Sequence, residues 1–147
     1  MRRFFQHYGL YLAWLVATVA TLGSLYFSEV MGFIPCKLCW WQRIFMYPQV
    51  LLLGMASYRD DRRLIPYLWP LSAVGGSISA FHYIQEQIPG LRVPVCGADV
   101  SCFTPWINWF GFITIPFMAL TAFTLILICL ALARPAGGDE AAPGEAR

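Results

Sequence analysis

The fold class is decided by one stretch, Trp109–Ala133 (WFGFITIPFMALTAFTLILICLALA), whose 25 residues contain no charged side chain. About 20 mostly apolar residues in helical form cross the hydrocarbon core of a bilayer. Three other stretches come close to this length, at residues 9–27, 40–58 and 64–83, and Arg43 is the only charge within them. The sequence therefore predicts an all-α, polytopic membrane protein, a four-transmembrane-helix bundle.

The composition of the whole chain supports a membrane protein. Of its 147 residues, 59% are hydrophobic and only 12% are charged, whereas about a quarter of the residues are charged in a typical soluble domain. The formal net charge of +2 argues against a nucleic-acid-binding protein, and the chain is too apolar to be disordered. We expect one transmembrane domain, residues 1–134, followed by a disordered cytoplasmic tail, residues 135–147, which is small and polar.

The orientation follows from the Lys and Arg residues of the loops, because these residues are enriched on the cytoplasmic side of membrane proteins. If both termini are cytoplasmic, the outer side carries three of them, Lys37, Arg43 and Arg92. The cytoplasmic side then carries seven, Arg2, Arg3, Arg59, Arg62, Arg63, Arg134 and Arg147. We therefore predict cytoplasmic N- and C-termini and two extracytoplasmic loops that each contain a cysteine pair.

The first cysteine pair, Cys36 and Cys39, lies in the sequence PCKLCWWQR, residues 35–43. If a helix begins near Cys36, then Cys36, Cys39 and Arg43 share one helical face. Unpaired backbone N–H groups at a helix N-terminus stabilise a thiolate, and Lys37 and Arg43 add positive charge. We therefore predict a reactive pair at the membrane interface, within reach of a molecule dissolved in the lipid.

The second cysteine pair, Cys96 and Cys102, encloses five residues in the loop before the last predicted span. A disulfide that closes so short a loop stabilises a protein by about 2 kcal/mol, which four packed helices hardly need. Two alternatives remain: a membrane scaffold with two structural disulfides, and a zinc site made from both pairs, although the spacing of the four cysteines fits no zinc ribbon. We favour a second redox-active pair and expect no metal.

These features together resemble the disulfide bond formation protein B (DsbB) family, and CKLCWWQR with the short second pair most resembles its BdbC-type branch. The resemblance covers the chain apart from its tail. It implies a thiol:quinone oxidoreductase of the bacterial plasma membrane. Such an enzyme reoxidises an extracytoplasmic DsbA/BdbD-like thioredoxin-fold oxidase and passes the electrons to a membrane quinone, ubiquinone or menaquinone, which sustains disulfide bond formation.

The same resemblance assigns roles to individual residues. Cys36 and Cys39 resemble the pair that reduces quinone, with Cys39 as the thiolate that faces the quinone ring. Arg43 resembles the residue that stabilises the quinone and this thiolate. In the loop, Cys96 resembles the cysteine that forms a mixed disulfide with the partner, and Cys102 resembles the one that releases it.

The chain departs from the best-studied branch of this family in the short spacing of its second pair and in Gln42, where that branch has an acidic residue. A vitamin K epoxide reductase-like thiol relay is the main alternative enzyme. In that relay the loop pair comes first and the membrane-embedded CxxC comes near the last span, which is the reverse of the order here.

For the remaining candidate residues, a purely structural role is the alternative to a functional one. Placing Arg43 part-way into the membrane costs up to about 3 kcal/mol, so its register with the cysteines favours a function over a simple interfacial anchor. His82, at the same membrane level, is a candidate for quinone contact or proton delivery, or else a structural interfacial histidine. We expect Cys129 to be a small apolar residue outside the relay. The sequence of residues 105–110 predicts either an amphipathic segment that lies on the outer membrane surface or a belt of aromatic side chains at the membrane interface.

Overall fold

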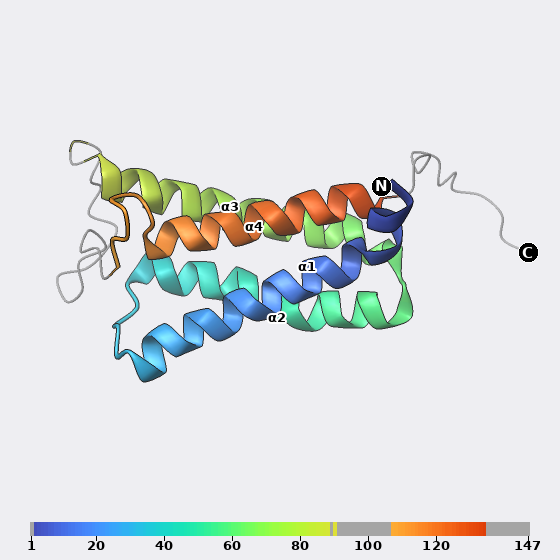
Figure 1. Ribbon diagram of the computed structural model, residues 1–147, viewed down its shortest axis with the longest axis horizontal. Coiled ribbons are helices and arrows are strands. Elements are labelled where there is room, and N and C mark those ends of the chain that lie inside the picture. Colours follow the sequence, from blue (N-terminus) through green and yellow to red (C-terminus); the bar gives the residue numbers. More distant parts are fainter. Residues whose placement is uncertain (1, 89, 91–106, 135–147) are drawn as a thin grey trace, which may run out of the picture.

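The computed structural model of the chain describes residues 2–88, 90 and 107–134, which contain four long helices (Figure 1). Each helix packs mainly against two others, so that α1 and α3 both contact α2 and α4. The bundle predicted from the sequence is therefore confirmed as an all-α fold. Its helices are α1 (Arg2–Leu25), α2 (Lys37–Arg59), α3 (Ile65–Gln87) and α4 (Ile115–Ala133).

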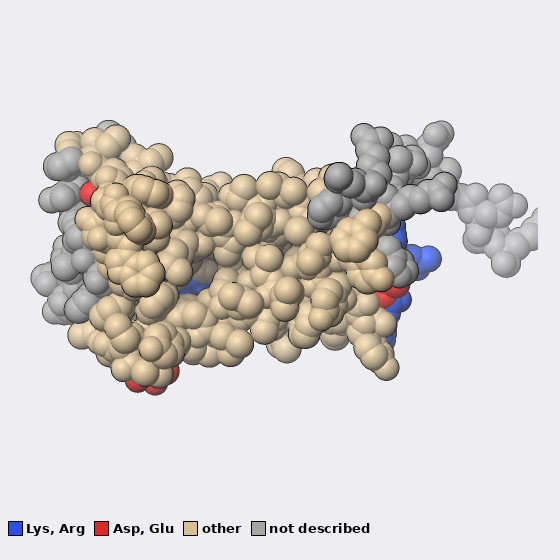
Figure 2. All heavy atoms as spheres, viewed as in Figure 1, with Lys and Arg blue, Asp and Glu red and all other residues tan. Residues whose placement is uncertain are grey.

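The two ends of the bundle carry different parts of the chain (Figure 1). The N-terminus, the turn between α2 and α3, and the last residue of α4 lie together at what we call the terminal end. The connections from α1 to α2 and from α3 to α4 lie at the opposite end, which we call the cysteine end because Cys36 lies there. Figure 2 shows Lys and Arg side chains gathered at the terminal end, the side that the charge distribution assigns to the cytoplasm.

Three helical segments are long and apolar enough to cross a membrane, namely Tyr8–Val30, Arg62–Gln87 and Ile115–Ala133. Helix α2 is as long, with 23 residues, but its apolar sequence is interrupted by polar side chains. Two of these, Gln42 and Gln49, are buried inside the bundle, so they lower the hydropathy of α2 without facing lipid. Length and composition thus support three of the four predicted spans.

Helix α4 begins at Ile115 and not at Trp109, where the apolar stretch begins. Trp109 and Ile113 pair as an isolated β-bridge, and Phe110 and Gly111 have positive φ angles of 56° and 81°, which a right-handed helix excludes. Trp109 and Phe110 are exposed at the cysteine end. Their exposure agrees with a surface segment here, but residues 105 and 106 lie outside the described part of the chain.

The core of the terminal end is closely packed and apolar. Leu53, Leu68, Ile126 and Leu130 are at most 1% exposed. Small residues let the helices approach, because a Cβ atom added at Gly9 would lie 2.9 Å from the Cβ of Ala133. This half of the bundle is held together by direct contact between helices.

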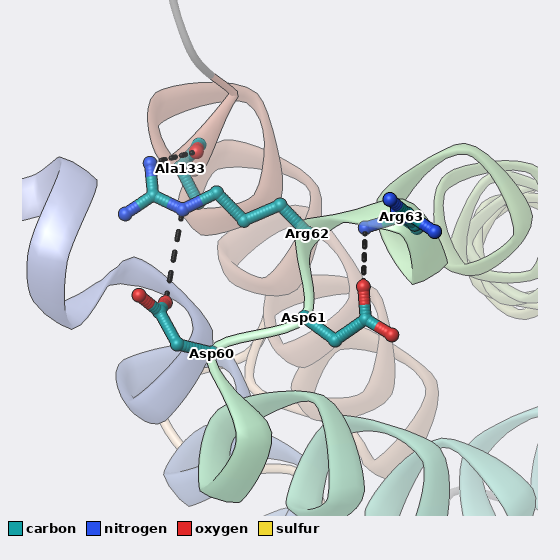
Figure 3. A network of polar contacts seen from close by, with 5 residues as sticks. All are labelled: Asp60, Asp61, Arg62, Arg63 and Ala133. Atoms are coloured by element: carbon teal, nitrogen blue, oxygen red, sulfur yellow. Dashed lines mark hydrogen bonds and ion pairs between the residues drawn. The ribbon is translucent and has the colours of Figure 1, made fainter.

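A polar turn closes the terminal end between α2 and α3 (Figure 3). Arg62 Nε lies 3.7 Å from Asp60 Oδ1, and Arg62 Nη1 donates to the carbonyl of Ala133 at 3.3 Å. The Arg63 backbone N–H donates to Asp61 Oδ1 at 3.0 Å. Because the last carbonyls of a helix have no partner within that helix, Arg62 ties this turn to the end of α4.

Candidate active site

The first cysteine pair forms the N-terminus of α2. Cys36 is the N-cap residue, and its Sγ accepts a hydrogen bond from the backbone N–H of Cys39, with an N to S distance of 3.4 Å. The two sulfurs lie 3.1 Å apart and both thiols are free. The Cys36 sulfur thus takes the place of a capping oxygen at the positive end of the helix dipole. The predicted start of the helix at Cys36 is confirmed.

Three donors surround the Cys36 sulfur and favour its thiolate. The largest effect comes from the hydrogen bond of the Cys39 thiol, followed by His82, whose Nε2 lies 3.7 Å from Cys36 Sγ. Together with the Cys39 backbone N–H, they outweigh the effect of burial and lower the pKa of the Cys36 thiol from 9.0 to about 4. The charge of the reduced pair therefore lies on Cys36. The predicted role of Cys39, as the sulfur that faces the quinone, stays a prediction.

His82 reaches the cysteine pair from α3 and is held in place by α2. The side chain is buried, and its Nδ1 lies 3.2 Å from the Gln42 side-chain nitrogen. Because an amide can either donate to or accept from a ring nitrogen, Gln42 fixes the orientation of the ring, while Nε2 points to Cys36. In the sequence, Gln42 stands out only as a departure from the acidic residue of the best-studied branch. The signal for its role is a polar residue three positions after Cys39, on the same helical face.

Arg43 lies one helical turn after Cys39 and links α2 to α1. Its Nη2 donates to the Ser24 carbonyl at 3.0 Å, and its guanidinium carbon lies 5.5 Å from the centre of the Trp40 ring. Ser24 immediately precedes the end of α1, which continues as a π-helical turn η1 (Tyr26–Val30). This carbonyl and the aromatic ring hold the cation between two helices. The predicted function of Arg43 stays a prediction.

A cavity of about 630 Å³ lies beside the cysteine pair. Its volume falls within the usual range of small-molecule sites, about 300–1,000 Å³. Figure 2 shows a hollow in the bundle with Lys or Arg atoms at its floor, and Arg43 is the one such residue among those that line the cavity. Most of the lining is apolar and comes from α1 and α4. Its charged and polar lining next to the thiols consists of Gln42, Arg43, His82 and Glu86.

Glu86 lies one helical turn beyond His82 on α3 and lines the same cavity, although it was not among the residues predicted from the sequence. Its Oε2 atom is buried and has no hydrogen-bond partner among the described residues. A signal was present in the sequence, because Glu86 and His82 are four residues apart at the outer end of an apolar stretch. Ionisable residues at such positions are rare and tend to be functional.

Metal binding is a weaker interpretation of the cysteine pair. Ligand atoms of Cys36, Cys39 and His82 lie within 4.8 Å of one another. A structural zinc site needs four ligands in tetrahedral geometry, and the group found in the described part of the chain stops at three. The close contact of two sulfurs at a helix N-terminus is better suited to thiol–disulfide exchange.

The other predicted residues lie elsewhere. Cys129, on α4, is not part of the cavity lining and packs against the apolar core, which agrees with a thiol outside the relay. The second pair, Cys96 and Cys102, lies outside the described residues, as do Arg92 and the tail 135–147. Their predicted roles and structures stay predictions.

Known proteins with similar sequences share the whole length of the bundle. Residues 6–133 match the family described as "Disulfide bond formation protein DsbB". The chain is 52% identical over 124 residues to disulfide bond formation protein C of Bacillus subtilis, a match that covers 84% of this chain and 90% of the relative. It is 49% identical over 126 residues to a probable disulfide formation protein C 1 of Bacillus anthracis, with 84% and 90% covered. A probable disulfide formation protein of Coxiella burnetii is 46% identical over 128 residues, with 85% and 86% covered. No solved structure gives a significant match.

Proposed function

Because the chain belongs to the disulfide bond formation protein DsbB family, we propose that it is a membrane thiol:quinone oxidoreductase. It reoxidises an extracytoplasmic thioredoxin-fold oxidase of the DsbA/BdbD type and passes the electrons to a membrane quinone. Family membership itself makes it a disulfide-forming oxidoreductase of the membrane. The observation that carries the finer proposal is a reactive dithiol at the wall of a mostly apolar cavity.

The chemistry of the cavity fits a quinone. The two carbonyl oxygens of a quinone accept hydrogen bonds, and the Arg43 guanidinium, which lines the cavity near the cysteine pair, is a hydrogen-bond donor. The apolar lining from α1 and α4 suits an isoprenoid chain. When bound there, a quinone supplies an acceptor for two electrons. Whether it is ubiquinone or menaquinone depends on the quinone pool of the membrane.

The residues around the pair have complementary roles in this proposal. The Cys36 thiolate is held by the helix N-terminus and by His82, whose ring is held in turn by Gln42. Arg43 lies one helical turn after Cys39 and lines the same cavity. When the two sulfurs join, the pair gives up two electrons, and the positive charge of Arg43 stabilises the negative charge that moves into the cavity.

The second pair completes the relay. Both described ends of the loop that contains it, Gln87 and Ile107, are at the cysteine end of the bundle. We propose that a thiolate of the reduced partner attacks the Cys96–Cys102 disulfide at Cys96, which forms a mixed disulfide and leaves Cys102 as a thiolate. Cys102 is then the thiol that can attack this bond and release the partner. The loop pair then passes its electrons to Cys36 and Cys39 by thiol–disulfide exchange.

The proposed membrane arrangement has four spans, with α2 as the fourth. The buried Gln42 and Gln49 turn the polar side of α2 toward the bundle, and Arg59, Arg62 and Arg63 lie at the terminal end. Reporter fusions after Asp60 and after Ala133 should therefore be cytoplasmic, and a fusion after Gly90 should be exported. The opposite pattern would place the cysteine pairs in a reducing compartment and rule out the relay.

A trapping experiment tests the function directly. When a CxxC partner is supplied in its oxidised form, Cys102→Ser should accumulate a mixed disulfide between Cys96 and this partner, because the releasing thiol is absent. Cys39→Ser should abolish quinone reduction but leave the thiol–disulfide exchange between the partner and the loop pair intact. Cys129→Ser is the matched control and should behave like the wild type. A trapped complex through Cys36, or normal partner oxidation without Cys96 and Cys102, would contradict the proposal, and a structural scaffold would show no quinone-dependent oxidation at all.

A further inference from the structure

The proposed reaction needs one more proton than the cysteine pair carries. A quinone becomes a quinol by taking up two electrons and two protons. The reduced pair supplies both electrons, but the Cys39 backbone N–H and His82 Nε2 hold Cys36 as a thiolate, so the pair has a single proton, on the Cys39 sulfur. Another group at the cavity must therefore supply the second proton.

Most ionisable groups that line the cavity are poor sources of this proton. Arg43 does not deprotonate in proteins. The two ring nitrogens of His82 already face Gln42 and Cys36. The Tyr47 hydroxyl is buried, and a phenol is a much weaker acid than a carboxyl group. The lining residues from α1 and α4 include no Asp, Glu, Lys, Arg or His, which leaves Glu86.

Glu86 is placed between the cavity and the cysteine end of the bundle. It lies next to Gln87, the last residue of α3, which is exposed. Its Oε2 is buried without a hydrogen-bond partner among the described residues, and the Thr114 hydroxyl lies beside the carboxyl group. An unpaired buried carboxylate oxygen is costly, whereas a protonated carboxyl group gains an O–H donor. The side chain is therefore suited to carrying a proton at this place.

We propose that Glu86 is the proton donor of this site, a role that rests on the proposed quinone reduction. The Cys36 thiolate and the Cys39 thiol form a disulfide and lose two electrons and one proton. The Glu86 carboxyl group gives up the second proton and becomes a carboxylate, and the quinone gains both electrons and both protons. Solvent at the cysteine end then reprotonates Glu86.

Two substitutions separate the acid from the shape of the side chain. Glu86→Gln keeps the size and polarity but has no proton to give, and Glu86→Asp keeps the acid. Glu29→Gln is the matched control, because Glu29 is an exposed acid at the same end, in η1, and does not line the cavity. Each protein is reduced, and its reoxidation by a short-chain quinone is followed by stopped flow across a range of pH.

We expect Glu86→Gln to slow reoxidation by about 10²-fold at neutral pH, the low end of what a positioned proton donor contributes. The wild-type rate should fall as rising pH deprotonates Glu86, and this dependence should vanish in the Glu86→Gln protein. Formate, a small acid, should restore part of the rate, and Glu86→Asp should restore more. Glu29→Gln should match the wild type. An unchanged rate and pH profile in Glu86→Gln would overturn the inference while leaving the proposed function intact.

A second measurement needs no quinone. Infrared difference spectra between the oxidised and reduced wild-type protein should contain a protonated-carboxyl band that responds to the state of Cys36 and Cys39. This band should be missing in Glu86→Gln and present in Glu29→Gln. A band that persists in Glu86→Gln would overturn the inference. A wild-type protein with the band but without quinone reduction would instead overturn the proposed function, and the inference with it.

Discussion

The same four helices build two halves that differ in packing. At the terminal end, side chains such as Leu53 and Leu130 are completely buried between helices. At the cysteine end, the buried apolar cluster consists of Cys36 and Leu38, with Cys39 and Ile78 packed against it, beside a cavity of about 630 Å³. The closely packed half holds the helices in place, and this support lets the other half keep an open space with reactive groups.

Buried polar side chains also differ between the cysteine end and the rest of the bundle. Gln42 and His82 contact each other next to the cavity. Farther from the cysteine pair, Ser72 donates to the buried Gln49 side chain at 2.8 Å and joins α2 to α3. At the terminal end, the fully buried side chains Leu53, Leu130 and Ala133 are apolar. Substitutions in the open half should therefore change chemistry, and substitutions in the packed half should change stability.

Of three substitutions that compare the two halves of the bundle, Arg43→Ala should have the largest effect. Losing one hydrogen bond from a charged donor costs about 1.5–3 kcal/mol, so KM for quinone should rise about tenfold or more. Expression and the KM for the partner should stay nearly unchanged. Lys37→Ala is a suitable control, because Lys37 is an exposed cation at the same end. Unchanged quinone kinetics in Arg43→Ala would show that Arg43 is an interfacial anchor.

Gly75→Ala tests the boundary between the two halves. An added Cβ would lie 2.4 Å from two atoms of the Phe123 ring, which is buried in the core and also lines the cavity. Such overpacking costs about 1–3 kcal/mol, and should lower the unfolding temperature in detergent. The neighbouring Gly76→Ala is the control, because its Cβ would lie 3.4 Å from Phe123. Equal stability of the two variants would mean that the Phe123 ring moves into the cavity without cost.

The smallest effect should come from Cys129→Ala. Cys129 packs against the core and does not line the cavity, so the loss of its sulfur removes a small apolar group. Partner oxidation should stay within about threefold of the wild type, which corresponds to less than about 1 kcal/mol. A loss as large as that of a Cys36 variant would identify Cys129 as a fifth redox thiol.

Local sequence patterns predicted the parts of the molecule that depend on near neighbours. Uncharged stretches of sufficient length predicted the helices, because apolar length determines them. The spacing of Cys36, Cys39 and Arg43 predicted one helical face at the start of α2, because residues three and four apart lie on the same side of a helix. The structure confirms both, although α4 begins at Ile115, after a turn that its apolar composition did not reveal.

Contacts between helices were harder to predict. His82 meets Gln42 and Cys36 only because α3 packs against α2, and no local pattern gives that register. Glu86 was missed for the same reason, since it belongs to the cavity through the fold rather than through a motif. Cys96 and Cys102 were recognised by spacing and resemblance, and they lie outside the described residues.

The capping role of Cys36 links the redox state of the pair to the shape of the chain. As a thiolate, its sulfur is the acceptor that closes the first turn of α2. In a disulfide the same sulfur carries no charge and is a much weaker acceptor, so oxidation replaces this hydrogen bond by a covalent link to Cys39. The first turn of α2 is thus held by charge when the pair is reduced and by a covalent bond when it is oxidised.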